Sequence, residues 1–103
     1  MATLTILYGH PEDPVAFEDY YANRHLPWAT KTMPGVQGAQ LRRVLGAPGG
    51  NPLYYRIAEM TWPDHDALQA ALATDEGKAV LADTENFATG GAVMLVGQED
   101  QPA

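Results

Sequence analysis

Several common features are missing from this sequence of 103 residues. It contains no cysteine, which excludes a disulfide framework and thiolate chemistry. Basic residues are scarce, because Lys and Arg number 6 against 13 Asp and Glu, for a net charge of −7. A chain of this charge repels phosphate backbones and anionic lipid surfaces. We therefore expect neither nucleic acid nor a membrane among its partners.

The sequence also lacks long apolar segments and the usual cofactor motifs. No apolar run approaches the ~20 residues of a membrane span, and the opening residues MATLTILYGH lack the charged start of a signal peptide, so we expect a cytoplasmic protein. No G-x-G-x-x-G motif follows a strand, which argues against a nicotinamide site. The Gly- and Pro-rich segment 46–52 has no Lys-Ser/Thr pair after it. His10, His25 and His65 show no metal-ligand spacing, and we predict no metal and no bound cofactor.

What is present indicates a globular α+β protein. Hydrophobic residues make up 46% of the chain and charged residues 18%, which is not the composition of a disordered chain. The length suits one domain, residues 1–103, with its core at about 3–97 and a polar tail at 98–103. Hydrophobic periodicity, caps and Gly/Pro breaks predict strands at 3–8, 36–45, 53–62 and 92–96, and helices at 13–32, 64–73 and 75–83. This βαββαβ order is ferredoxin-like: a four-stranded antiparallel sheet with its helices on one face.

The predicted strands carry apolar side chains on both faces of that sheet. Ile6 alternates with Leu7 in the first strand, and Trp62 alternates with Ile57 in the third. One layer of helices covers one face only, and soluble monomers rarely keep a large apolar patch exposed. We therefore predict a homodimer in which the uncovered sheet faces pack together.

The helix predicted from Asp13 carries the main candidate for chemistry, His25. Its larger side chains recur at helical spacing and form one stripe: Phe17, Tyr20, Tyr21, Arg24, His25 and Trp28. Pro27 cannot donate a backbone hydrogen bond to Asn23 and crowds that carbonyl, so we expect the helix to kink or end near His25. A histidine beside a broken backbone ladder is a candidate site. The same pattern also fits a core histidine hydrogen-bonded to a carbonyl, beside tyrosines that only pack.

The opening half of the chain resembles the EthD family. The matching features are the segment 7–14 (LYGHPEDP), Phe17, the pair Tyr20-Tyr21, the spacing Tyr21-x-x-x-His25-x-Pro27, and Pro34-Gly35. The resemblance extends from residue 3 to about 97, although its second half, with Trp62, Leu68, Asp83 and Phe87, is more generic. Trp28 departs from the family pattern, in which a smaller aliphatic residue is expected, and would narrow a cavity beside His25.

The resemblance implies a homodimer of the dimeric α+β barrel superfamily, with a pocket between each sheet and its helices. It also implies an association with oxidative breakdown of small organic molecules, since EthD is named for ethyl tert-butyl ether degradation and accompanies a cytochrome P450 system. Many members are labelled reductase or oxidoreductase without a demonstrated reaction. Superfamily relatives include cofactor-free monooxygenases, polyketide cyclases, lactone isomerases and haem-degrading enzymes, so the fold does not select the chemistry.

The candidate residues suit proton transfer on a small hydrophobic molecule. Histidine titrates near neutral pH and can take or give a proton, and a phenol can stabilise an enolate oxygen. We predict His25 and Tyr21 as catalytic residues. The side chains expected to bind the substrate are Tyr8, Phe17, Trp28, Tyr55 and Phe87.

Three functional hypotheses stand at this point. The first is an enzyme acting on an aromatic, polyketide-like or ether-derived metabolite, with His25 as general acid or base. The second is a non-catalytic protein that binds a small molecule or supports an oxygenase. The third is a haem-handling protein with His25 as axial ligand.

Overall fold

A computed structural model describes residues 1–100 of the chain. The elements are β1 (Ala2–Gly9), α1 (Pro14–Tyr20), η1 (Tyr21–His25), α2 (Leu26–Thr32), β2 (Gly38–Arg43), β3 (Tyr54–Trp62), α3 (His65–Ala73), α4 (Asp75–Ala82), η2 (Asp83–Asn86) and β4 (Ala92–Gln98). The segment η1 is a π-helix and η2 is a 3₁₀-helix. The predicted βαββαβ order is confirmed.

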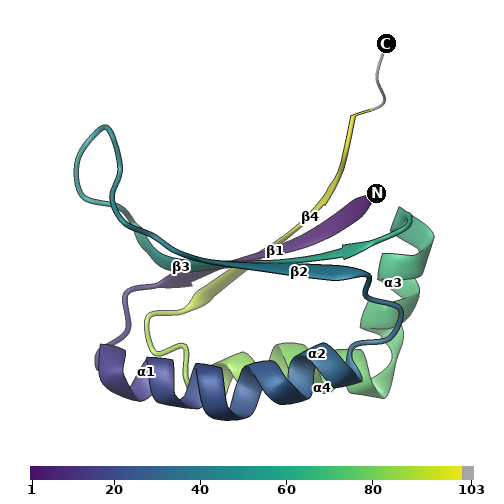
Figure 1. Cartoon of the computed structure of the whole chain (residues 1–103), viewed down its shortest axis with the longest axis horizontal. Helices are drawn as coiled ribbons and strands as arrows, with labels where there is room; N and C mark the ends of the chain where they lie inside the picture. The colour runs from purple at the N-terminus through teal and green to yellow at the C-terminus, as the bar shows by residue number, and fades with distance from the viewer. Residues whose placement is uncertain (101–103) are drawn as a thin grey trace.

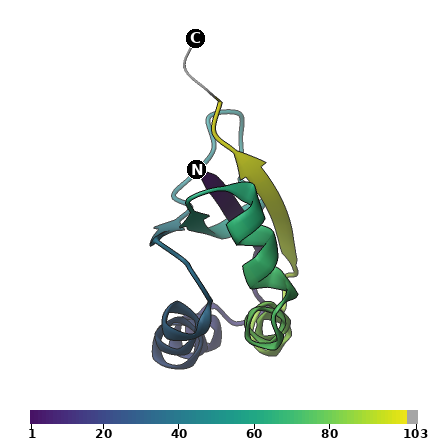
Figure 2. The same ribbon diagram turned by 90° about the vertical axis from the view of Figure 1, so that its right-hand side faces the viewer.

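The four strands form one antiparallel sheet in the order β2-β3-β1-β4. The helices all lie on one side of this sheet, as predicted (Figure 1). Viewed from the end, the α1–α2 rod and α4 lie side by side beneath the strands, and α3 rises from α4 towards them (Figure 2). None of the helices in residues 1–100 combines the length and the apolar character that crossing a membrane requires.

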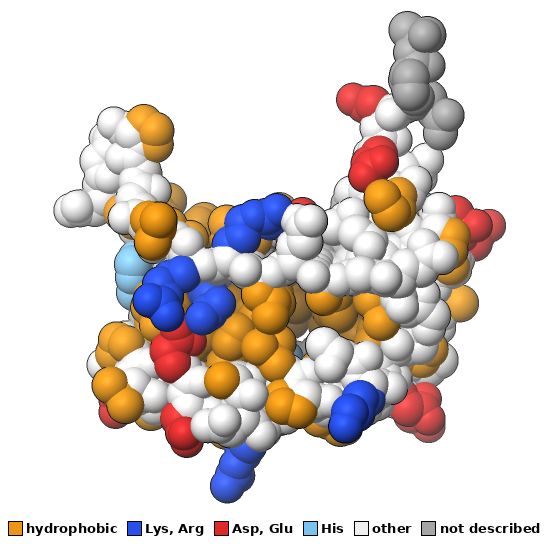
Figure 3. Space-filling view, viewed as in Figure 1, with side chains coloured by type: hydrophobic (Ala, Val, Ile, Leu, Met, Phe, Trp, Pro, Cys, Tyr) orange, Lys and Arg blue, Asp and Glu red, His pale blue; other side chains and the backbone are white. Residues whose placement is uncertain are grey.

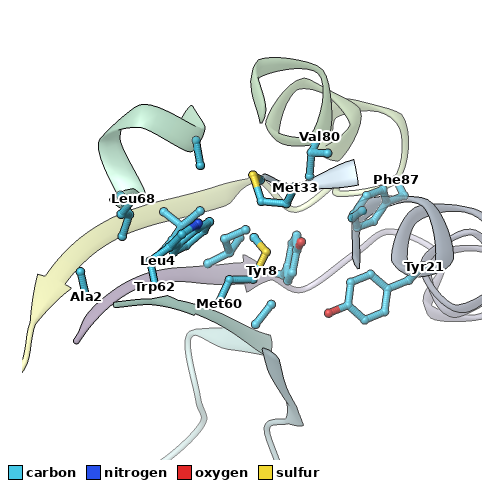
Figure 4. Packing of buried hydrophobic residues seen from close by; sticks show 14 of the residues in the cluster. Ala2, Leu4, Tyr8, Tyr21, Met33, Met60, Trp62, Leu68, Val80 and Phe87 are labelled. Carbon is cyan, nitrogen blue, oxygen red and sulfur yellow. The ribbon is translucent and has the colours of Figure 1, made fainter. Parts of the chain in front are cut away.

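Alternation along the strands decides which side chains enter the core. In β1, Leu4, Ile6 and Tyr8 are buried under the helices, while the residues between them are only half-buried. Leu4 pairs with Met60 and Ile6 with Ala58, so β3 contributes its buried side chains to the same face. The largest fully buried side chains are Trp62, Tyr8, Tyr21, Phe17, Leu4, Leu68 and Val80 (Figure 4).

Two strands differ from their predicted bounds. β2 is shorter than the predicted 36–45, because its regular pairing with β3 runs only from Gly38, opposite Thr61, to Arg43, opposite Arg56. β4 is longer than the predicted 92–96, because Ala2 and Thr3 of β1 pair with Gln98 and Gly97. Gln98, predicted as tail, is therefore in the strand. Residues 101–103 of the predicted tail lie outside the described residues.

The face of the sheet turned away from the helices is uncovered in this chain. Leu7 and Ile57 lie on it half-buried, and Val93 and Leu95 are 42% and 53% exposed. The β2–β3 loop and the end of β4 both extend beyond this face (Figure 1). The apolar face that the sequence predicted is present.

Candidate functional site

His25 is positioned by a widened turn in the first helical rod. The N–H of Leu26 donates to the carbonyl of Tyr21, five residues back, at the end of the π-helix η1. Pro27 has no N–H, and the widened turn absorbs this gap in the ladder, so the rod continues through α2 to Thr32. The predicted irregularity is therefore present as a π turn and not as an end of the helix. The side chain of His25 is only 5% exposed.

A carboxylate that is distant in the sequence holds the His25 ring. Nδ1 of His25 lies 2.8 Å from Oδ2 of Asp83, which begins η2. Since a carboxylate can only accept, Nδ1 carries the proton of the neutral imidazole and Nε2 is left with a free lone pair. The hydroxyl of Tyr20 donates to the other oxygen, Oδ1, at 2.7 Å, and Nδ2 of Asn86 donates to it at 2.9 Å. Both oxygens of Asp83 are thus occupied by donors.

These donors also fix the charge of Asp83. Burial raises the pKa of its carboxyl, but the hydrogen bonds from His25, Asn86 and Tyr20 outweigh burial and hold the pKa below its ordinary value. The carboxylate is therefore ionised at neutral pH and accepts a hydrogen bond from the imidazole. This His–Asp arrangement is the one that orients a general base in many enzymes.

Aromatic rings surround the imidazole on its other sides. The Phe87 ring lies 4.7 Å from it, centroid to centroid, and the Tyr21 ring lies nearly parallel to it at 6.0 Å, with 13° between the planes. Phe87 in turn contacts Tyr8, Phe17 and Tyr20. This packing leaves the imidazole little rotational freedom.

A hollow opens next to His25, between the sheet and the α1–α2 rod. Tyr8, Tyr21 and His25 line it, and the rest of the lining is mostly aliphatic, from Ile6, Leu26, Leu41 and Met60 among others. Its empty volume is about 330 Å³, counted out to the open mouth. In the space-filling view the mouth lies between β2 and the helices, lined by hydrophobic side chains with Lys and Arg side chains at its rim (Figure 3).

Two hydroxyl groups in this hollow have no partner. The side chains of Tyr8 and Tyr21 are 0% and 1% exposed, and their hydroxyl oxygens are the buried side-chain polar atoms of the described residues that lack a hydrogen bond. Burial raises the pKa of Tyr21 to about 12 and that of Tyr8 still further. Both are therefore neutral hydrogen-bond donors at physiological pH. Since buried polar groups are nearly always satisfied, an acceptor from outside the chain is expected here.

The structure brings together some of the predicted site residues and separates others. His25, Tyr21 and Tyr8 line the hollow, whereas Phe17 and Phe87 pack behind them. Trp28 is 39% exposed and does not line the hollow, so it does not narrow it. Tyr55 lies in a register shift of β3, where its ring contacts Phe17 outside the hollow.

Sequence reasoning missed the partners of the central residues. Asp83 lies 58 residues after His25, and Asn86 and Tyr20 complete its hydrogen bonds. One signal was available. An acid at the carboxyl end of a helix interacts unfavourably with the helix dipole, so the position of Asp83 indicated a role other than stabilising the helix. Arg56, whose side chain faces Tyr21 from β3, also carried a signal, because it alternates with Ala58 and Met60 and a charge on such an apolar face needs a partner.

Neither a metal nor haem suits the site. No group of three or more His, Asp or Glu side chains in residues 1–100 is arranged to hold a metal ion. The 330 Å³ includes open solvent at the mouth, and the enclosed space is about 20 Å³, which is far below the roughly 300 Å³ of ligand pockets. The hollow does not fit a macrocycle of the size of haem, and a molecule of one or two rings enters it only if its lining moves apart.

Comparison with known proteins identifies related chains. The family model described as "EthD domain" matches residues 9–91. An uncharacterised 11.0 kDa protein from the thcB–thcC intergenic region of Rhodococcus erythropolis is 33% identical over 100 residues, which cover 97% of this chain and 96% of that protein.

Solved structures show the same arrangement. A protein of the ethyl tert-butyl ether degradation (EthD) family from Bacillus halodurans has a TM-score of 0.87 at 39% identity, covering 97% of this chain and 99% of that one. SnoaB from Streptomyces nogalater, a cofactor-independent oxygenase, has a TM-score of 0.58 at 20% identity, covering 99% of this chain and 96% of that one. At that identity the likeness shows the fold alone.

Proposed function

Since the chain belongs to the EthD family, we propose that this EthD-family protein is a small cofactor-free acid–base enzyme whose general base is His25. The observation that carries the proposal is the His25–Asp83 pair beside an apolar hollow. Asp83 fixes the proton on Nδ1, which leaves Nε2 as the proton acceptor. The hollow supplies a dry environment for a small hydrophobic molecule.

The reaction that suits these groups is removal of a proton next to a carbonyl. The C–H bond breaks, its proton moves to Nε2 of His25, and the electron pair moves onto the carbonyl oxygen as an enolate. The Asp83 carboxylate stabilises the imidazolium, and the hydroxyls of Tyr8 and Tyr21 can donate to the enolate oxygen. In an isomerisation the enolate is conjugated with a C=C bond, and His25 returns the proton to the far carbon of that bond. In a cyclisation the enolate carbon forms a bond to a second carbonyl carbon of the same molecule, and His25 returns the proton to the oxygen of that carbonyl. Neither course needs a co-reactant.

The same enolate would also begin an oxygenation if dioxygen were the oxidant. SnoaB, which shares the fold, is a cofactor-independent oxygenase. This likeness supports a common first step, the loss of a proton, and does not select the later steps. The label oxidoreductase, which many family members carry, would correspond to this oxygenation and not to the isomerisation.

Exchange of carbon-bound protons with solvent tests the first step directly. We expect the wild-type protein to accelerate deuterium incorporation next to the carbonyl of β-tetralone, a two-ring ketone, in deuterium oxide buffer. The His25→Gln variant should lose roughly a hundred- to ten-thousandfold of this acceleration, because general base catalysis is worth that much. Proton NMR of the ketone measures the rate.

The exposed His65 provides the matched control. It lies at the start of α3, and His65→Gln should exchange the ketone at the wild-type rate. Exchange no faster than in buffer, with β-tetralone nevertheless bound to the protein, would favour the non-catalytic binding protein instead.

We further propose that two copies associate through the uncovered sheet faces. A helix layer protects the other face, and the apolar side chains of Leu7, Ile57, Val93 and Leu95 share this one. A relative of the same fold from Thermobifida fusca is a dimeric ferredoxin-like protein. This likeness supports the dimer in general terms, and the choice of face follows from the exposed residues.

A charge on the uncovered face should separate the copies. Leu95→Glu places a carboxylate in the proposed interface, and we expect the dimer dissociation constant to rise by at least about a hundredfold. Val15→Glu is the matched control, because Val15 is 80% exposed on the helical side. Sedimentation velocity measures both; equal dissociation constants in Leu95→Glu and wild type would place the interface elsewhere.

A further inference from the structure

The unpartnered hydroxyls in the hollow lie beside a half-buried cation, Arg56. Its guanidinium carbon is 4.8 Å from the centroid of the Tyr21 ring, and Arg56 is the register partner of Tyr8 across the β1–β3 ladder. Only 15% of the Arg56 side chain is exposed. The imidazole of His25 stacks on the same Tyr21 ring.

Glu18 holds Arg56 in this position. Nε and Nη2 of Arg56 donate to the two oxygens of Glu18 at 3.1 and 2.9 Å, and Arg43 lies 3.7 Å from the same carboxylate. The charged groups of this cluster, behind the Tyr21 ring, are thus two arginines and one glutamate. In a chain with a net charge of −7, this is a local excess of positive charge.

The two hydroxyls need an acceptor that the described residues do not supply. Tyr8 and Tyr21 contact each other edge to face, with ring centroids 5.7 Å apart. In the close-up of the core the rings lie near each other, and the Tyr21 hydroxyl points away from its helix into the interior (Figure 4). Hydrogen bonds to an ionised oxygen are about twice as strong as those to a neutral one, so an ionised oxygen of a bound molecule is the acceptor that these hydroxyls bind best.

We propose that Tyr8, Tyr21 and Arg56 form a recognition site for the negatively charged oxygen of a small enol or phenol that enters the hollow when its lining moves apart. The inference deepens the proposed function, on which it rests, by naming the substrate class: molecules whose oxygen becomes an anion when a proton is lost. A site of this kind binds the enolate more tightly than the ketone, which is the condition for catalysis. A stable phenolate mimics that enolate.

The probe is para-nitrophenolate, measured by isothermal titration calorimetry at a pH where the free probe is mostly ionised. Both tyrosines stay protonated there, because burial raises their pKa. We expect Tyr8→Phe and Tyr21→Phe each to bind the probe about ten- to a hundredfold more weakly, as expected for loss of a hydrogen bond to a charged acceptor. Tyr54→Phe, a half-buried position of β3 that does not line the hollow, should bind like the wild type.

Variants of the Glu18–Arg56 ion pair distinguish an electrostatic role of Arg56 from a purely structural one. Glu18→Gln removes the charge that compensates Arg56, so the probe should bind more tightly. Arg56→Met removes the positive charge, so the probe should bind more weakly. Because both variants break the same ion pair, a purely structural role would weaken binding in both. Weaker binding in both variants would overturn the inference.

Two further outcomes separate this inference from the proposed function. Equal affinity for para-nitrophenolate and the neutral para-nitrotoluene, or unchanged affinity in both tyrosine variants, would overturn the anion site even if His25 catalyses exchange. Conversely, the His25→Gln variant should still bind para-nitrophenolate. If it binds the probe while the wild type shows no exchange of β-tetralone, the anion site stands and the proposed catalysis fails.

Discussion

The Asp83→Asn variant is expected to fold normally and to lose roughly a hundred- to ten-thousandfold of the proton-exchange rate. Asparagine has the shape of aspartate but only one oxygen. In the wild type, Oδ1 accepts from Tyr20 and Asn86 and Oδ2 accepts from His25. If the asparagine oxygen takes the place of Oδ1, it still accepts from Tyr20 and Asn86, and the NH₂ group lies at the place of Oδ2. The NH₂ group then donates to Nδ1 of His25, which can accept only if it carries no proton.

The proton of the neutral imidazole would then move to Nε2, the atom that has to accept a proton from the substrate. Asp83 is thus a positioning residue, and its loss acts through the tautomer of His25. Rates of β-tetralone exchange, measured as for His25→Gln, give the size of the effect. The matched control is Asp19→Asn, an exposed acid on α1 whose side chain accepts from Asn23. A wild-type rate in Asp83→Asn would show that the carboxylate has no part in the chemistry.

The largest loss of stability is expected from Trp62→Ala. Trp62 is 0% exposed at the end of β3, and its Nε1 donates to the carbonyl of Pro34 at 2.8 Å. Removing the ring leaves a cavity and an unsatisfied carbonyl, at a cost of about 3–5 kcal/mol. Small domains have only about 5–15 kcal/mol of stability, so this variant should be partly unfolded near physiological temperature.

The second tryptophan is the control for the first. Trp28 is 39% exposed on α2 and does not line the hollow. We expect Trp28→Ala to change the free energy of unfolding by less than about 1 kcal/mol and to leave β-tetralone exchange unchanged. Urea unfolding followed by circular dichroism compares the two variants. Equal losses in both would contradict the assignment of Trp62 to the core.

Local patterns in the sequence were sufficient to predict the architecture. The alternation of Leu4, Ile6 and Tyr8 predicted the buried face of β1, and Asp13 and Asp64 cap their helices as expected. Each of these signals lies within a few residues of the element that it predicts. The bounds of β2 and β4 were less predictable, because the strand partner decides where pairing stops.

The sequence predicted only the part of the candidate site that lies on the first helical rod. Pro27 indicated an irregularity at His25, and the spacing of Tyr21 and His25 placed both on one stripe. The other half of the site is built from distant segments: Asp83 approaches from the end of α4, and Arg56 approaches from β3. No local pattern pairs residues that are 58 positions apart. The register shift that carries Tyr55 outside the hollow was hidden for the same reason.

The tautomer of His25 tests the proposed general base most directly, and proton–nitrogen correlation NMR reads it at a pH where the ring is neutral. We predict a proton on Nδ1 and a free lone pair on Nε2 in the wild type, and a shift of the proton to Nε2 in Asp83→Asn. A wild-type imidazole that carries its proton on Nε2 would contradict this mechanism, because the nitrogen left free by Asp83 would then have no lone pair with which to accept a proton.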